Sequence, residues 1–108
     1  MVFKVFVMKG GLAYTIHQII NFKEKNKDSP ERIAAFVYLE FATKHHFMDG
    51  NKRAAHFAAQ TFLFLYSHKR ISIEYEKAVP YIIEIAANKH PLKEIEQWIK
   101  ENSEIIKI

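Results

Sequence analysis

Two long apolar segments separated by one short turn constrain the fold of this chain most. Residues 30–44 are apolar around most of a helical circumference, which predicts a central helix. Residues 51–69 combine alanines, which permit close approach, with large aromatic and aliphatic side chains that we expect to fill space. The turn between them carries Gly50, the only glycine after Gly11. This pattern predicts two helices packed together in the middle of one domain.

Further residues that favour helix starts, and segments with apolar periodicity, predict an all-α bundle with few strands. Ser29 and Pro30 favour a helix start there, because serine can cap free N–H groups and proline suits the first turn. Val2 to Met8 is β-branched and aromatic and predicts a short strand, while residues 70–75 predict a short strand or an extended connector. The remaining predicted helices span 12–26, 76–89 and 91–107, the last packed down by Trp98, Ile95, Ile99, Ile105 and Ile106.

Length and composition predict one soluble domain, residues 1–108. A chain of 108 residues is long enough for one hydrophobic core and too short for two. The absence of cysteine excludes disulfides and thiolate metal sites. The net charge of +4 suits an anionic partner without selecting one. No apolar run approaches the roughly 18 residues of a membrane span, and Met1 to Met8 is short for a signal peptide, so we expect a cytoplasmic protein.

Residues 45–56, which contain the turn, carry the residue types of phosphate chemistry. If Gly50 and Asn51 open the following helix, its first N–H groups lack partners and point at one spot that suits a phosphate. Gly50 permits close approach of the backbone. Lys52 and Arg53 add positive charge, and the Arg53 guanidinium can hold two phosphate oxygens.

The residues just before this helix supply the other roles of a transferase. Asp49 is a hard oxygen ligand and a candidate to hold Mg²⁺ that is also bound by a nucleotide. Histidine titrates near neutral pH, so His45 is the candidate base that takes a proton from an attacking hydroxyl. Phe47 lies between them and is expected to point inward and hold the loop.

Simpler interpretations compete with this one. His45, His46 and His56, taken singly, suit ordinary surface or interface positions, and the two cations suit a solvated first helical turn. A metal hydrolase using His45, His46 and Asp49 is a weaker alternative, because no second cluster of histidines and acids completes its ligand set. Nonspecific nucleic-acid binding is weaker still, since the basic residues are spread along the chain without a stacked aromatic pattern. Taken jointly, the residues favour phosphate chemistry.

The run over residues 45–53 resembles the His-x-Phe-x-(Asp/Glu)-Gly-Asn-x-Arg signature of the Fic/Doc superfamily. The residues that match it are His45, Phe47, Asp49, Gly50, Asn51 and Arg53. The surrounding helices are similar as well, so the resemblance covers roughly residues 12–100. It implies a compact helical bundle with a short β flap beside the active site, which residues 1–11 would supply.

The resemblance also implies a role for each motif residue. His45 is the base for a Ser, Thr or Tyr hydroxyl of a target protein. Asp49 binds Mg²⁺, while Gly50, Asn51 and Arg53 hold the phosphates of ATP. These roles agree with the chemistry argued from the residues themselves.

Lys52 and His56 decide which branch of the superfamily the chain resembles. Fic AMP-transferases usually have glycine in place of Lys52 and a second arginine in place of His56. Asn51-Lys52-Arg53 is similar to the Doc branch, the death-on-curing toxins, in which the lysine is associated with reversed ATP binding and transfer of the γ-phosphoryl group. The resemblance therefore implies a toxin kinase, with elongation factor Tu as the type of target. Because His56 stands where those AMP-transferases have the second arginine, the resemblance implies that one contact to phosphate is lost.

Restraint of such a toxin would come from a separate, small antitoxin. The Ser/Thr-x-x-x-Glu-Gly/Asn helix that restrains many Fic proteins has no counterpart in this sequence.

Two other functions stay open at this point. One is a Fic-type AMP-transferase, and the other is a catalytically silent binding module on the same fold.

Overall fold

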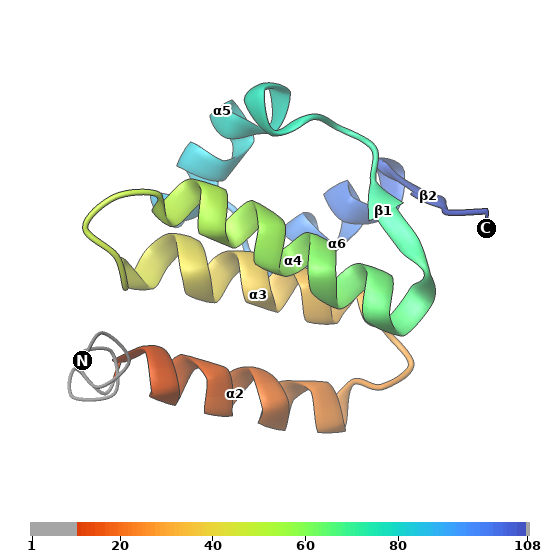
Figure 1. Ribbon diagram of the computed structural model, residues 1–108, viewed down its shortest axis with the longest axis horizontal. Coiled ribbons are helices and arrows are strands. Elements are labelled where there is room, and N and C mark those ends of the chain that lie inside the picture. The colour runs from red at the N-terminus through yellow and green to blue at the C-terminus, as the bar shows by residue number, and fades with distance from the viewer. Residues whose placement is uncertain (1–10, 108) are drawn as a thin grey trace.

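The computed structural model describes residues 11–107, which are mostly helical (Figure 1). The helices are α2 (Gly11–Lys25), α3 (Pro30–Lys44), α4 (Asn51–Ser67), α5 (Tyr75–Ala86) and α6 (Leu92–Glu101), and the strands are β1 (Lys69–Ile71) and β2 (Ser103–Ile105). The predicted all-α bundle is confirmed. The predicted N-terminal strand or flap falls outside the described residues. None of the described helices is both long and apolar enough to cross a membrane.

Helix α3 lies at the centre of the bundle and contacts each of the other described helices. In Figure 1 it runs beside α4, with α2 on its other side. Both α3 and α4 contribute alanines with almost no exposed surface, and small side chains let helix axes approach closely. The central position predicted for residues 30–44 is therefore confirmed. The larger side chains of the core include Tyr38, Ile19, Ile33, Leu63, Ile82, Ile85, Ile95 and Ile99.

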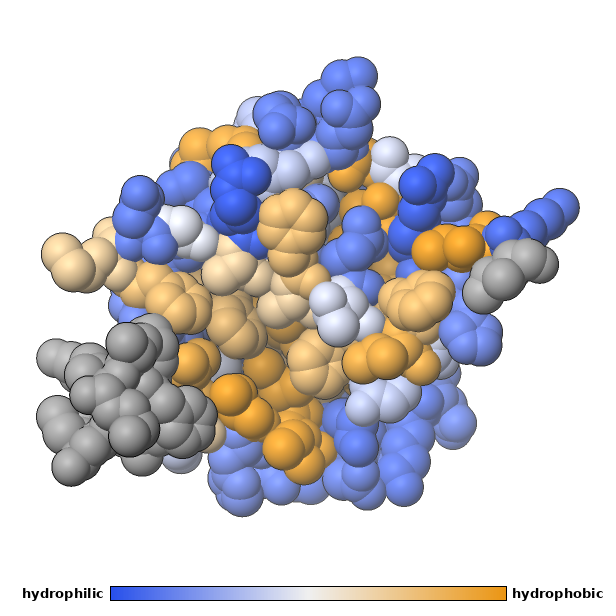
Figure 2. Space-filling view, viewed as in Figure 1, coloured by the Kyte–Doolittle hydropathy of each residue, from blue (hydrophilic) through white to orange (hydrophobic). Residues whose placement is uncertain are grey.

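The outer side of α4 carries large apolar side chains that we expected to fill the interior. Phe57 is 51% exposed and Leu65 is 59% exposed, so that expectation is wrong for this side of the helix. The reason is that α4 packs mainly on α3 and leaves its opposite side to solvent. Figure 2 shows apolar side chains gathered over α4 and α2. We call this surface the apolar face; its exposed residues include Ile16, Ile20, Phe57, Phe64 and Leu65.

The chain after α6 forms a strand instead of continuing the helix. We predicted one helix over 91–107, but α6 ends at Glu101 and β2 pairs antiparallel with β1, with Lys69 opposite Ile105. Ile105 is 65% exposed and does not pack the helix down as predicted. The periodicity of a single segment contains no information about a partner strand, because the pairing is made with residues more than thirty positions earlier.

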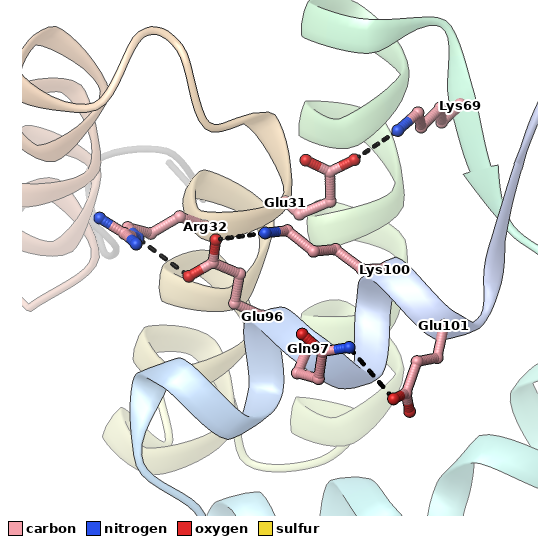
Figure 3. A network of polar contacts seen from close by, with 7 residues as sticks. All are labelled: Glu31, Arg32, Lys69, Glu96, Gln97, Lys100 and Glu101. Carbon is pink, nitrogen blue, oxygen red and sulfur yellow. Dashed lines mark hydrogen bonds and ion pairs between the residues drawn. The ribbon is translucent and has the colours of Figure 1, made fainter.

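Two buried carboxylates attach α3 to β1 and to α6 (Figure 3). Glu31 is 7% exposed and accepts a hydrogen bond of 2.6 Å from Lys69 Nζ. Glu96 is 5% exposed and lies 2.9 Å from Arg32 Nε and 3.3 Å from Lys100 Nζ. Burial opposes ionisation of Glu96, but the hydrogen bonds from Arg32 and Lys100 outweigh it and lower its pKa. The charged carboxylate therefore stabilises the attachment of α6 to α3.

Glu96→Gln is expected to lower the free energy of unfolding by about 1–3 kcal/mol at neutral pH, because Arg32 and Lys100 lose their charged partner. The pKa of Glu96 is lowered in the folded state, so its contribution is present above the carboxyl pKa of the unfolded chain. The contribution is lost as the pH falls through the folded value. Urea denaturation of wild type and variant at about pH 7 and about pH 3 measures both effects.

Glu101→Gln is the matched control. Glu101 is an exposed carboxylate on the same helix, and it accepts a hydrogen bond from the Gln97 side chain. Its effect should stay below about 0.5 kcal/mol. An equal loss in both variants, or a loss for Glu96→Gln that does not shrink in acid, would contradict this account of the attachment.

Candidate functional site

The loop over residues 45–50 brings the predicted site residues to one end of the bundle. Because α3 and α4 run side by side, the loop places the end of one helix beside the start of the other (Figure 1). His45 is the C-cap residue of α3 and has left-handed backbone angles, φ 52° and ψ 52°. This conformation costs a non-glycine residue about 1–2 kcal/mol. It turns the chain out of the helix and leaves the His45 side chain exposed to solvent.

Asn51 holds the loop through both groups of its side-chain amide. Its Oδ1 accepts a hydrogen bond of 3.0 Å from the Phe47 backbone N–H, and its Nδ2 donates to the Phe47 carbonyl at 2.8 Å. Phe47 itself is partly buried. The side chain of Asn51 thus fixes the loop, while its backbone N–H lies at the first position of α4.

Gly50 and Asp49 shape the N-terminus of α4. Gly50 is the N-cap residue with φ 79°, a conformation that glycine adopts without strain. Its N–H donates to Asp49 Oδ1 at 2.8 Å, and its carbonyl accepts from the Ala54 N–H at 2.8 Å. The N–H groups of residues 51–53 precede that first helical hydrogen bond, which is where a helix offers donors to an anion.

Asp49 is the one acidic side chain in residues 45–53, and it is exposed. A single carboxylate suits Mg²⁺ when the phosphates of a ligand supply further oxygens. Within residues 11–107 no group of three His, Asp or Glu side chains is placed to hold a metal ion by itself. His46, a ligand in the metal-hydrolase alternative, instead hydrogen-bonds Thr15 Oγ1 through Nε2 at 2.8 Å, and burial lowers its pKa. The metal-binding side chains within residues 11–107 therefore do not support the metal-hydrolase alternative.

Arg53 lines a cleft of about 550 Å³ between α4, the segment after β1 and the start of α5. Its guanidinium lies 4.3 Å from the centre of the Tyr75 ring, a cation–π contact. Phe57 stacks on Tyr75 with ring centres 6.3 Å apart. His56 and Glu76 also line the cleft. The charged end of the motif is therefore continuous with an aromatic surface.

His56 lies apart from the exposed loop, one turn into α4. It is 2% exposed, and its Nδ1 is 2.6 Å from the hydroxyl of Tyr38. Burial lowers the pKa of His56, and the carboxylate of Glu76 opposes this shift. The structure thus divides the predicted site: His45, Asp49 and Gly50 are exposed at one end of α4, whereas Arg53 and His56 line the cleft.

Sequence patterns give no indication of the aromatic residues that contact the site. Tyr38 and Tyr75 meet His56 and Arg53 from other helices, and no local spacing relates them. Thr15 is different, because it is a polar residue in the apolar stripe of α2 and is 1% exposed. An isolated polar residue on a buried helix side is a signal that a polar partner is present.

Residues 5–63, more than half of the 108, match the sequence model of the Fic/DOC family. The chain belongs to the Fic/DOC family. Searches of curated proteins and of solved structures find no match. Fic/DOC proteins are in general transferases that modify other proteins and use ATP with a divalent metal ion. Membership supports a protein-modifying transferase activity of this general kind.

Asn51→Ala is expected to release the loop, because both hydrogen bonds to the Phe47 backbone are lost. The amide of Phe47 should exchange with solvent about 5- to 150-fold faster, as expected for a loss of about 1–3 kcal/mol of local stability. Hydrogen exchange followed by NMR measures this rate. Asn21→Ala, at an exposed asparagine of α2, is the control and should leave the Phe47 amide unchanged. Equal protection in Asn51→Ala and wild type would refute the role assigned to Asn51.

Proposed function

We propose that the chain is a Doc-like toxin of a toxin–antitoxin pair, a kinase that transfers the γ-phosphoryl group of ATP to a hydroxyl of a translation protein such as elongation factor Tu. The observation that carries the proposal is the exposed Lys52 beside Arg53 in the first turn of α4, directly after the loop that begins at His45. Both residues belong to the first turn of α4, whose N–H groups favour phosphate. Residues 1–108 would act as one domain in the cytoplasm.

In the proposed reaction the imidazole of His45 takes the proton of the target hydroxyl, whose oxygen attacks the γ-phosphorus of ATP. A new O–P bond forms, the bond from the γ-phosphorus to the ADP oxygen breaks, and ADP leaves. The N–H groups of residues 51–53 and the cations of Lys52 and Arg53 stabilise charge on the transferred group. Asp49 would hold the Mg²⁺ that neutralises the phosphates.

The cleft offers a place for the rest of the nucleotide. Arg53 belongs both to the motif and to the lining of the cleft. Phe57 and Tyr75 present aromatic rings, and nucleobases stack on such rings regardless of sequence. A nucleotide lying along α4 would have its phosphates at the helix start and its base at these rings.

The apolar face supports a protein partner. Its exposed residues come from two helices, and soluble monomers rarely expose contiguous apolar surface of this kind without a function. A small antitoxin that covers the apolar face with its own apolar side chains is the partner that we propose. It would restrain the toxin from outside the chain.

Label transfer from ATP to purified elongation factor Tu tests the proposed function. The γ-phosphate label should reach the protein, while the α-phosphate label should not. His45→Ala should lower the rate by about 10²- to 10⁴-fold, because a general base typically contributes that much. His17→Ala removes an exposed histidine of α2 and should leave the rate unchanged.

Lys52→Gly separates the two transfer reactions. We expect it to reduce γ-phosphoryl transfer, because the lysine is what distinguishes the proposed kinase site. Label from the α position on the target, with none from the γ position, would overturn the kinase and favour the Fic-type AMP-transferase. No binding of ATP in calorimetry, together with a His45→Ala variant as toxic as wild type, would favour the catalytically silent binding module.

A further inference from the structure

His56 and Tyr38 form a buried pair to which the proposed reaction gives no role. Tyr38 on α3 has no exposed surface, and its hydroxyl lies 2.6 Å from Nδ1 of His56 on α4. Phe57 and Tyr75 contact the His56 ring, each with ring centres 5.5 Å apart. Contacts from α3, α4 and α5 therefore hold the imidazole in one orientation.

The positions of the protons in this pair follow from its hydrogen bonding. Burial raises the pKa of the Tyr38 phenol, so the hydroxyl keeps its proton. Among the described residues Tyr38 makes its one side-chain hydrogen bond to His56. If Nδ1 carried a proton and donated it, the buried Tyr38 O–H would have no acceptor, which costs about 1–3 kcal/mol. The hydroxyl therefore donates to Nδ1, and the neutral imidazole carries its proton on Nε2.

Nε2 of His56 faces the cleft. Among the described residues no fully buried side-chain nitrogen or oxygen lacks a hydrogen-bond partner, and His56 makes its one hydrogen bond through Nδ1. Nε2 is consequently open to the cleft that the residue lines. Arg53 precedes His56 by one helical turn, on the same side of α4, and lines the same cleft.

We propose that His56 is a positioning residue whose Nε2–H donates to a phosphate oxygen of the bound nucleotide, beside the Arg53 guanidinium. Tyr38 fixes the imidazole in this neutral donor form. The inference rests on the proposed nucleotide-dependent function. A second cation would add attraction from any direction, whereas the fixed imidazole adds one directional hydrogen bond and so selects the orientation of the phosphates.

The charged residues that line the cleft are consistent with a neutral hydrogen-bond donor at His56. Glu74 and Glu76 line the cleft together with Arg53 and Arg70, so acidic and basic groups nearly balance there. Burial lowers the pKa of His56 against the opposing effect of Glu76. The donor role needs no protonation of the ring, since Nε2 already carries a hydrogen.

NMR of protein labelled with ¹⁵N-histidine tests the inference directly. Long-range ¹H–¹⁵N spectra distinguish protonated from unprotonated ring nitrogens, and the His56→Gln variant assigns the His56 signals. We expect a protonated Nε2 and an unprotonated Nδ1 near neutral pH. A non-hydrolysable ATP analogue with Mg²⁺ should shift the His56 signals and leave those of the exposed His68 unchanged. A protonated Nδ1, or a mixture of tautomers, would overturn the assignment.

Tyr38→Phe removes the fixed donor and keeps the volume of the ring. The His56 ring should then become a mixture of tautomers, and the dissociation constant of the analogue should rise about 3- to 10-fold. Tyr81→Phe, at a tyrosine stacked on Trp98, is the matched control and should keep wild-type affinity. Unchanged His56 signals and unchanged affinity in Tyr38→Phe would refute the role of Tyr38.

The same titration separates this inference from the proposed function. Analogue-induced shifts at the amides of Gly50 and Lys52, with none at His56, would overturn the phosphate contact and leave the proposed function standing. Absence of shifts at all three residues would overturn nucleotide binding, and with it both proposals.

Discussion

The packing of α3 against α4 is the contact on which the rest of the structure depends. Alanines such as Ala34 and Ala55 have no exposed surface and let the helices approach closely. Because the two helices are joined by a short loop, their packing places the end of one beside the start of the other. The exposed His45 and the N–H groups of residues 51–53 are brought to one place in this way. The Asn51 amide then fixes the loop itself.

Polar contacts between helices set how the other elements attach to this pair. Thr15 joins α2 to the loop through His46, and Glu96 joins α6 to α3 through Arg32. Buried polar groups of this kind are costly unless they are paired, so each contact favours one arrangement of its helices over others. The Tyr38–His56 contact does the same in the core and also orients a ring nitrogen toward the cleft.

Much of the fold and of the candidate site could be predicted because the signals are local. The helices follow from apolar periodicity, and the motif over residues 45–53 occupies one continuous stretch. The predictions were wrong where contacts between residues far apart in the sequence determine the structure. The segment after Glu101 pairs with β1 and is not helical, and Phe57 is exposed because α3 covers the other side of α4. No spacing in the sequence relates His56 to Tyr38 or Arg53 to Tyr75.

The all-α class, the approximate helices and a phosphate-type motif at the start of α4 could be predicted from the amino-acid sequence alone, because backbone propensity and helix-terminus chemistry depend on neighbouring residues. That Arg53 and His56 line the same cleft became evident from the tertiary packing, and our inference that His56 presents a neutral donor there rests on the same packing. Those properties depend on burial and on a hydroxyl from another helix. Burial and the Tyr38 hydroxyl thus support a role for His56 that the sequence motif does not assign to it.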